Sequence, residues 1–61
     1  MLLDVGDEVK LRNGEIMVIT YIEGDEIEGF NKKGWMKRPY RKNVVEKTGR
    51  HFQLPIEENK V

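Results

Sequence analysis

Short apolar runs alternate with turn signals along most of this chain. The turn-forming dipeptides recur about every ten residues, a spacing typical of short antiparallel strands joined by hairpins. They are Gly6-Asp7, Asn13-Gly14, Gly24-Asp25 and Lys33-Gly34. The predicted strands span residues 8–12, 15–22, 26–30, 35–40 and 43–46. The pattern therefore predicts an all-β fold, a small five-stranded barrel.

The second predicted strand differs from the first in its pattern. Val9 and Leu11 alternate with charged residues, as in a strand with one buried face. Residues 16–22 are instead apolar on both faces, so we expect the central, strongly bent strand of a partly open barrel. A helix is disfavoured there because β-branched residues crowd the run and glycines flank it.

The first hairpin has two possible registers. Asn-Gly favours a two-residue type I′ turn, which would pair Leu11 with Ile16 and Val9 with Val18. A three-residue loop with a bulge would instead set Leu11 and Val9 opposite Glu15 and Met17. We expect the two-residue turn.

The end of the chain is expected to close the barrel and then leave it. Pro39 cannot donate a ladder hydrogen bond, so the fourth strand should lie at an edge or stop there. Residues 41–43 predict a tight connection with room for one 3₁₀ turn. We expect a barrel over residues 1–49 and a tail over residues 50–61, which either docks as an extended edge segment or is flexible, with fraying at 57–61.

Length and composition restrict the class of protein. Sixty-one residues make at most one domain, and the absence of cysteine excludes disulfides and thiolate metal sites. Asp4 follows the opening Met-Leu-Leu at once, so we expect no signal peptide. No run approaches the roughly 20 apolar residues of a membrane span, so we expect none. The expected location is the cytoplasm.

Charge is sorted along the sequence although the formal net charge is zero. Residues 1–31 hold eight acids and two bases, whereas residues 32–50 hold eight bases and one acid. The second part contains a basic segment, residues 32–42, with two aromatic residues among its cations. Cations that neutralise phosphates and flat rings that stack on bases are what a single-stranded nucleic acid requires. The candidate binding residues are Lys32, Lys33, Trp35, Lys37, Arg38, Tyr40, Arg41 and Lys42.

A purely structural interpretation of the same segment stays open. Alternation would send Trp35 and Lys37 to one face and Met36, Arg38 and Tyr40 to the other. Some aromatic residues should therefore be core, with Trp35 or Tyr40 filling the barrel and the bases protecting an edge strand. The binding surface also requires that carboxylates of the first two hairpins leave these cations unpaired.

The acidic half has its own alternatives. Its residues are expected to form a solvated rim around the turns, or a surface that imitates nucleic acid or meets the basic segment of another copy. They are Asp4, Asp7, Glu8, Glu23, Asp25, Glu26 and Glu28.

Nothing in the sequence predicts catalysis. The chain has no cysteine, no serine and no glycine-rich phosphate loop. His51 is the single histidine, and no second ligand type stands at metal spacing from it, so a structural or exposed role is expected. The prediction is a protein that is not an enzyme, with no cofactor and no metal.

Residues 5–46 resemble a known fold family. The string VGDEVKLRNGEIMVI, followed by an acidic Gly-Asp turn and an apolar strand, looks like the opening of small SH3-like barrels. It is similar to KOW-type and Tudor-like modules, and more so to small bacterial and phage proteins that begin with a GDxVxLxxG segment. The resemblance implies a barrel that binds nucleic acid or protein without catalysis. The later glycine of KOW modules and the aromatic cage of Tudor modules have no counterpart here.

These observations define the functional hypotheses. The first is an accessory or regulatory binding module whose basic hairpin contacts nucleic acid or a nucleoprotein. The alternative is a protein-interaction module, or a phage-type inhibitor of a host protein. The candidate partner is then an acidic protein surface. A third is a structural protein that self-associates as a homo-oligomer.

Overall fold

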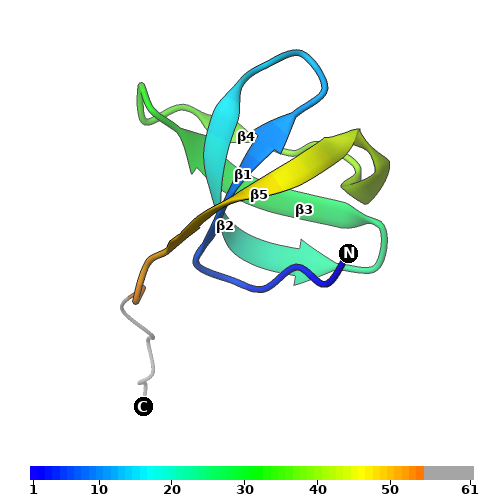
Figure 1. Cartoon of the computed structure of the whole chain (residues 1–61), viewed down its shortest axis with the longest axis horizontal. Coiled ribbons are helices and arrows are strands. Elements are labelled where there is room, and N and C mark those ends of the chain that lie inside the picture. Colours follow the sequence, from blue (N-terminus) through cyan, green and yellow to red (C-terminus); the bar gives the residue numbers. More distant parts are fainter. Residues whose placement is uncertain (55–61) are drawn as a thin grey trace.

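A computed structural model describes residues 1–54 and contains five strands and one short 3₁₀ helix. The strands are β1 (Asp7–Leu11), β2 (Ile16–Glu23), β3 (Glu26–Asn31), β4 (Met36–Lys37) and β5 (Val44–His51). The 3₁₀ helix η1 (Arg41–Asn43) leads directly into β5, as the sequence predicted for this connection. All strand pairs are antiparallel, in the order β4-β3-β2-β1-β5. The single sheet curves into a partly open barrel with β4 and β5 at its edges, which confirms the predicted all-β class (Figure 1).

The first hairpin adopts the register that we did not expect. Val9 lies opposite Met17, and the N–H of Leu11 donates to the carbonyl of Glu15. The expected two-residue turn is wrong because a type I′ turn needs positive φ at both central residues. Only Gly14 of this loop has positive φ, at 91°, so Asn13-Gly14 belongs to a three-residue loop that ends in a glycine bulge.

β2 occupies the centre of the sheet, as its two-sided apolar pattern predicted. Its pairing with β3 shifts register between Ile19 and Tyr21. Next to this shift the two backbones approach closely, and Gly29 is the residue that allows it. A Cβ atom at position 29 would overlap the Val18 carbonyl and the Met17 side chain.

The fourth strand is shorter than predicted, but it lies at an edge as expected. The residues after β4 continue to pair with β3 in the same register. Glu26 and Tyr40 form a bridge, and the N–H of Ile27 donates to the Pro39 carbonyl. Pro39 can accept but not donate, which limits the regular part of the strand to two residues.

The fifth strand is longer than predicted and crosses the expected boundary at residue 49. β5 follows β1 to His51, with two register shifts and a positive φ of 98° at Gly49. Phe52 N–H then donates to the carbonyl of Gly6. The first part of the expected tail is therefore docked on the sheet. Residues 55–61, on which the predicted fraying at 57–61 falls, lie outside the described part of the chain.

The core formed by residues 1–54 is small and contains no aromatic side chain. Six buried side chains form it, and Leu3 and Ile22 pack against them. The core residues are Val9, Leu11, Met17, Ile19, Ile27 and Val44. The expectation that Trp35 or Tyr40 fills the barrel is wrong: both are more than half exposed, because the aliphatic residues already occupy the narrow interior.

The described helical content is limited to the single turn η1. None of the helices in residues 1–54 has the length and apolar character that crossing a membrane requires.

Candidate functional site

The β3–β4 loop is held in one shape by Asn31. Its backbone N–H donates to the Trp35 carbonyl, and its own carbonyl accepts from Gly34, whose φ is 83°. The Asn31 side-chain oxygen accepts from the N–H groups of Lys33 and Trp35, at 2.9 and 3.0 Å. We call residues 32–35 the hairpin tip. Sequence reasoning did not single out Asn31, although an asparagine just before a Lys-Lys-Gly turn is a signal for such local bonds.

Trp35 stands in solvent at the hairpin tip with two cations beside its ring. Trp35 is 62% exposed. The Nζ atoms of Lys33 and Lys37 lie 5.6 and 5.9 Å from the ring centroid. This arrangement confirms that Trp35 and Lys37 share a face, and it combines a flat ring with positive charge.

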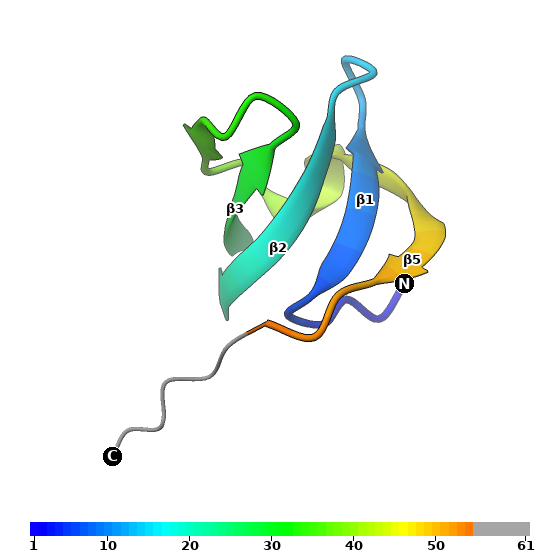
Figure 2. The ribbon, with the colours of Figure 1, turned by 90° about the vertical axis from the view of Figure 1, so that its left-hand side faces the viewer.

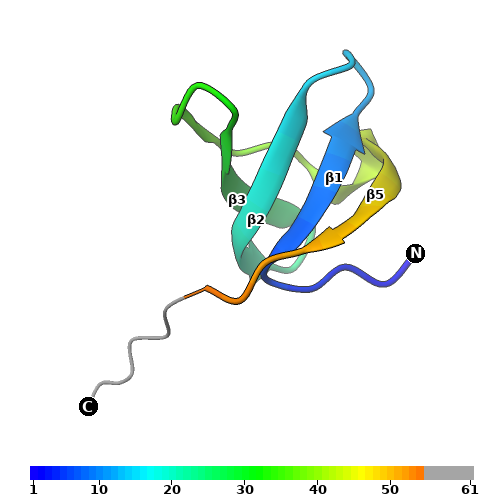
Figure 3. The same cartoon turned by 60° about the vertical axis from the view of Figure 1, so that its left-hand side comes forward.

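A groove of about 320 Å³ separates the hairpin tip from the β1–β2 loop. Both loops lie at the same end of the sheet (Figures 2 and 3). Glu15 is the acid in this groove, and its carboxylate accepts from Asn31 Nδ2 at 2.7 Å and lies 3.7 Å from Lys37 Nζ. The Asn31 hydrogen bond, aided by Lys37, lowers the pKa of Glu15 although partial burial opposes it. The groove therefore holds one carboxylate that is already engaged.

Three of the candidate residues lie at the opposite end of β3. Tyr40 pairs with Glu26, whereas Trp35 lies opposite Asn31. The backbones of the two aromatic residues are therefore about 17 Å apart along β3. Lys42 Nζ lies 6.0 Å from the Tyr40 ring, and Arg41 binds backbone carbonyls of the β2–β3 turn. The structure thus divides the predicted site into two groups.

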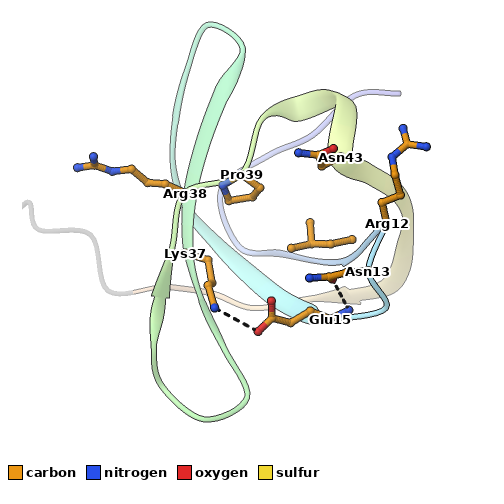
Figure 4. Close-up of a pocket in the computed structure, with 8 residues that line it drawn as sticks. Arg12, Asn13, Glu15, Lys37, Arg38, Pro39 and Asn43 are labelled. Carbon is orange, nitrogen blue, oxygen red and sulfur yellow. Dashed lines mark hydrogen bonds and ion pairs between the residues drawn. The ribbon is translucent and has the colours of Figure 1, made fainter.

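Arg38 belongs to neither group. Its Nε donates to Glu28 Oε2 at 2.9 Å. Figure 4 shows Arg38 pointing away from a hollow of about 400 Å³, into which Lys37 reaches toward Glu15. The predicted alternation along β4 therefore separates Lys37 from Arg38.

The cations of the basic segment are only partly neutralised. Lys37 and Arg38 pair with Glu15 and Glu28, which come from the first two hairpins. Within residues 1–54 no carboxylate lies within 4.0 Å of the ammonium groups of Lys32, Lys33 or Lys42. The hairpin tip consequently keeps its positive charge.

Asp7 forms a second polar cluster that the sequence did not predict. It was expected on a solvated rim, but it is only 7% exposed because β5 covers it. His51 Nδ1 lies 2.8 Å from its Oδ1, Lys47 Nζ lies 3.5 Å from its Oδ2, and Asp4 N–H donates to Oδ2. The bond to His51 is the main reason that the pKa of Asp7 is lowered, against the effect of burial.

Glu8 is buried beside this cluster. Thr48 Oγ1 donates to its Oε1 at 2.7 Å, and Arg50 Nε lies 4.0 Å from the same oxygen. These contacts join β1 to β5, so their role is structural. No group of three potential metal ligands occurs among the residues that the structure describes.

Comparison with known proteins gives no match: no protein-family model fits the chain, and no curated protein or solved structure is significantly similar to it.

Proposed function

We propose that this protein is a non-catalytic binding module that contacts nucleic acid, free or within a nucleoprotein, through the hairpin tip. The observation that carries the proposal is the exposed Trp35 ring with the ammonium groups of Lys33 and Lys37 about it. Lys32, which forms no ion pair within residues 1–54, adds a further cation in the same loop. The resemblance of residues 5–46 to small SH3-like barrels points to the same class of function.

The interaction energies favour a nucleic-acid base over the two lysine ammonium groups as the partner of the Trp35 ring. A cation over an exposed ring contributes about 0.5–1 kcal/mol. A base stacked on an aromatic side chain contributes about 1–3 kcal/mol. A base would therefore displace Lys33 and Lys37 from the face of Trp35. Lys37 would keep its ion pair with Glu15, and the ammonium group of Lys33 would contact a neighbouring phosphate.

The acidic half of the chain does not oppose this binding strongly. The acids of the β2–β3 turn, Glu23, Asp25 and Glu26, lie about 17 Å from the hairpin tip along β3. That separation is about twice the Debye length of about 8 Å at physiological salt. Glu15, the acid nearest the tip, is engaged by Asn31 and Lys37.

Fluorescence anisotropy with a labelled oligothymidine of about 12 nucleotides tests the proposal. Lys33→Glu should weaken binding by roughly tenfold, because it replaces a phosphate contact with repulsion. Lys42→Glu is the matched control, since Lys42 also lies over an aromatic ring but at the other end of β3. It should change the affinity by less than about threefold.

Two results would contradict the proposal. One is the absence of any anisotropy change with wild-type protein at low salt. The other is an equal loss of affinity in both variants, which would show that overall charge rather than the hairpin tip attracts the oligonucleotide.

A further inference from the structure

An apolar row crosses the outer face of the sheet from β2 to the edge strand β4. The register places Val18 of β2, Phe30 of β3 and Met36 of β4 side by side. Phe30 is 44% exposed and Met36 is 54% exposed, whereas their neighbours Ile27 and Gly29 are buried on the inner side. The row was not among the predicted site residues.

The row and Trp35 lie on the two sides of the same edge strand. Lys37, which shares a face with Trp35, pairs with the buried Gly29, whereas Met36 pairs with the exposed Phe30. β4 contains only two residues and no strand lies beyond it in the described sheet. A ligand that contacts both sides therefore has to bend around a narrow edge.

The charges beside the row suit a phosphate backbone. Lys32 follows Phe30 by two residues, and Arg38 neutralises Glu28, the acid that precedes Phe30 by two residues. Tyr21, an exposed aromatic residue of β2, differs from Phe30 in its surroundings. Its hydroxyl lies 3.4 Å from Glu23 Oε1, and the negative charge of Glu23 raises the pKa of Tyr21.

We propose that Phe30 is a second base-stacking position and that the ligand is an unpaired strand, which passes around the β4 edge from Trp35 to the outer face. This inference rests on the proposed function. Bases of a duplex are stacked on one another, and a duplex is stiff over about 150 base pairs, so it can neither offer a free base to Phe30 nor bend around the edge. An unpaired strand does both.

The Phe30→Leu variant tests this inference, since leucine keeps an apolar side chain and removes the ring. Its affinity for oligothymidine of about 12 nucleotides should fall by about tenfold, the loss expected for one stacked base. Its affinity for a duplex of the same length should not change. Tyr21→Leu is the matched control and should bind oligothymidine as the wild type does. Circular dichroism and thermal unfolding establish that each variant is folded.

The outcomes separate this inference from the proposed function. If Trp35→Leu weakens binding but Phe30→Leu does not, the second stacking position is overturned and the proposed function stands. If the wild type binds no oligonucleotide, both are overturned. Light scattering tests a different occupant of the row. A mass that rises with protein concentration in the wild type but not in Phe30→Leu would show that a second copy of the chain binds the row, and it would overturn the inference.

Discussion

Single residues fix the geometry of this small sheet where backbones approach closely. Gly29 is the main example, because β2 and β3 come so close beside the register shift that no Cβ atom fits. Its φ is not positive, so its need for glycine arises from space rather than from backbone conformation. No turn signal in the sequence marks such a residue.

Gly29→Ala should lower the free energy of unfolding by about 1–3 kcal/mol, the usual cost of overpacking. The clash is with the Val18 carbonyl, so β2 and β3 must separate locally. Gly14→Ala is the control: its Cβ would meet nothing within 4 Å, and the positive φ alone costs about 1–2 kcal/mol. Urea denaturation measures both. A Gly29→Ala protein as stable as the wild type would contradict the close approach.

The ionisation of Asp7 should make the free energy of unfolding depend on pH. Its folded-state pKa is lowered, chiefly by the bond to His51, so its ionised form stabilises the fold above the ordinary carboxyl value of about 4. This contribution is lost as the pH falls below that value toward the folded-state pKa.

The Asp7→Asn variant should be less stable at neutral pH by about 1–3 kcal/mol, because it weakens bonds to a buried charged group. Its stability should also decline less than that of the wild type between about pH 4 and pH 2. Glu46→Gln, an exposed change on the same pair of strands, should retain the wild-type acid dependence. Parallel acid-dependence curves for Asp7→Asn and wild type would refute this role.

At the scale of elements, two hairpin loops of the same form build the candidate site. In each loop a positive-φ glycine ends a three-residue connection, at Gly14 and at Gly34. The loops differ in their side-chain bonds: the Asn13 oxygen accepts one backbone N–H, whereas Asn31 accepts two and also donates to Glu15. Asn31 therefore positions Trp35.

Asn31→Ala should lower the free energy of unfolding by about 1–2 kcal/mol and weaken oligonucleotide binding, since Trp35 loses its support. Asn13→Ala, which removes one bond from the other loop, should affect stability less and leave binding near the wild-type value. Acrylamide quenching of the single tryptophan reports on the loop directly. Unchanged quenching in Asn31→Ala would contradict the positioning role.

The sequence predicted elements better than it predicted their pairing. Alternation and turn signals were sufficient for five strands, the edge position of β4 and the 3₁₀ turn before β5. The first register was wrong because Asn-Gly fits two loop types, and only the backbone of Asn13 decides between them. The length of β5 was missed because its polar residues show no apolar alternation, yet Asp7 and Glu8 bind them across the sheet.

Acidic and basic residues, which occupy different halves of the sequence, are only partly separated in the folded molecule. The fold pairs Lys37 and Arg38 with acids of neighbouring strands, and it sends Tyr40, Arg41 and Lys42 to the far end of β3. Sequence adjacency could not reveal this division, because it depends on the direction of β3 and on the alternation of β4. What remains at the hairpin tip is Trp35 with Lys32 and Lys33, for which the described residues supply no ion-pair partner.

The most direct test of the account is a titration of Trp35 fluorescence with oligothymidine at salt concentrations from about 50 to 200 mM. Stacking on Trp35 should quench its emission. Two lysine contacts, from Lys32 and Lys33, should give a slope of log affinity against log salt of about −1.4, at about −0.7 for each phosphate of a single strand. Unquenched emission at the lowest salt, or quenching whose affinity does not depend on salt, would contradict a nucleic-acid site at this hairpin tip.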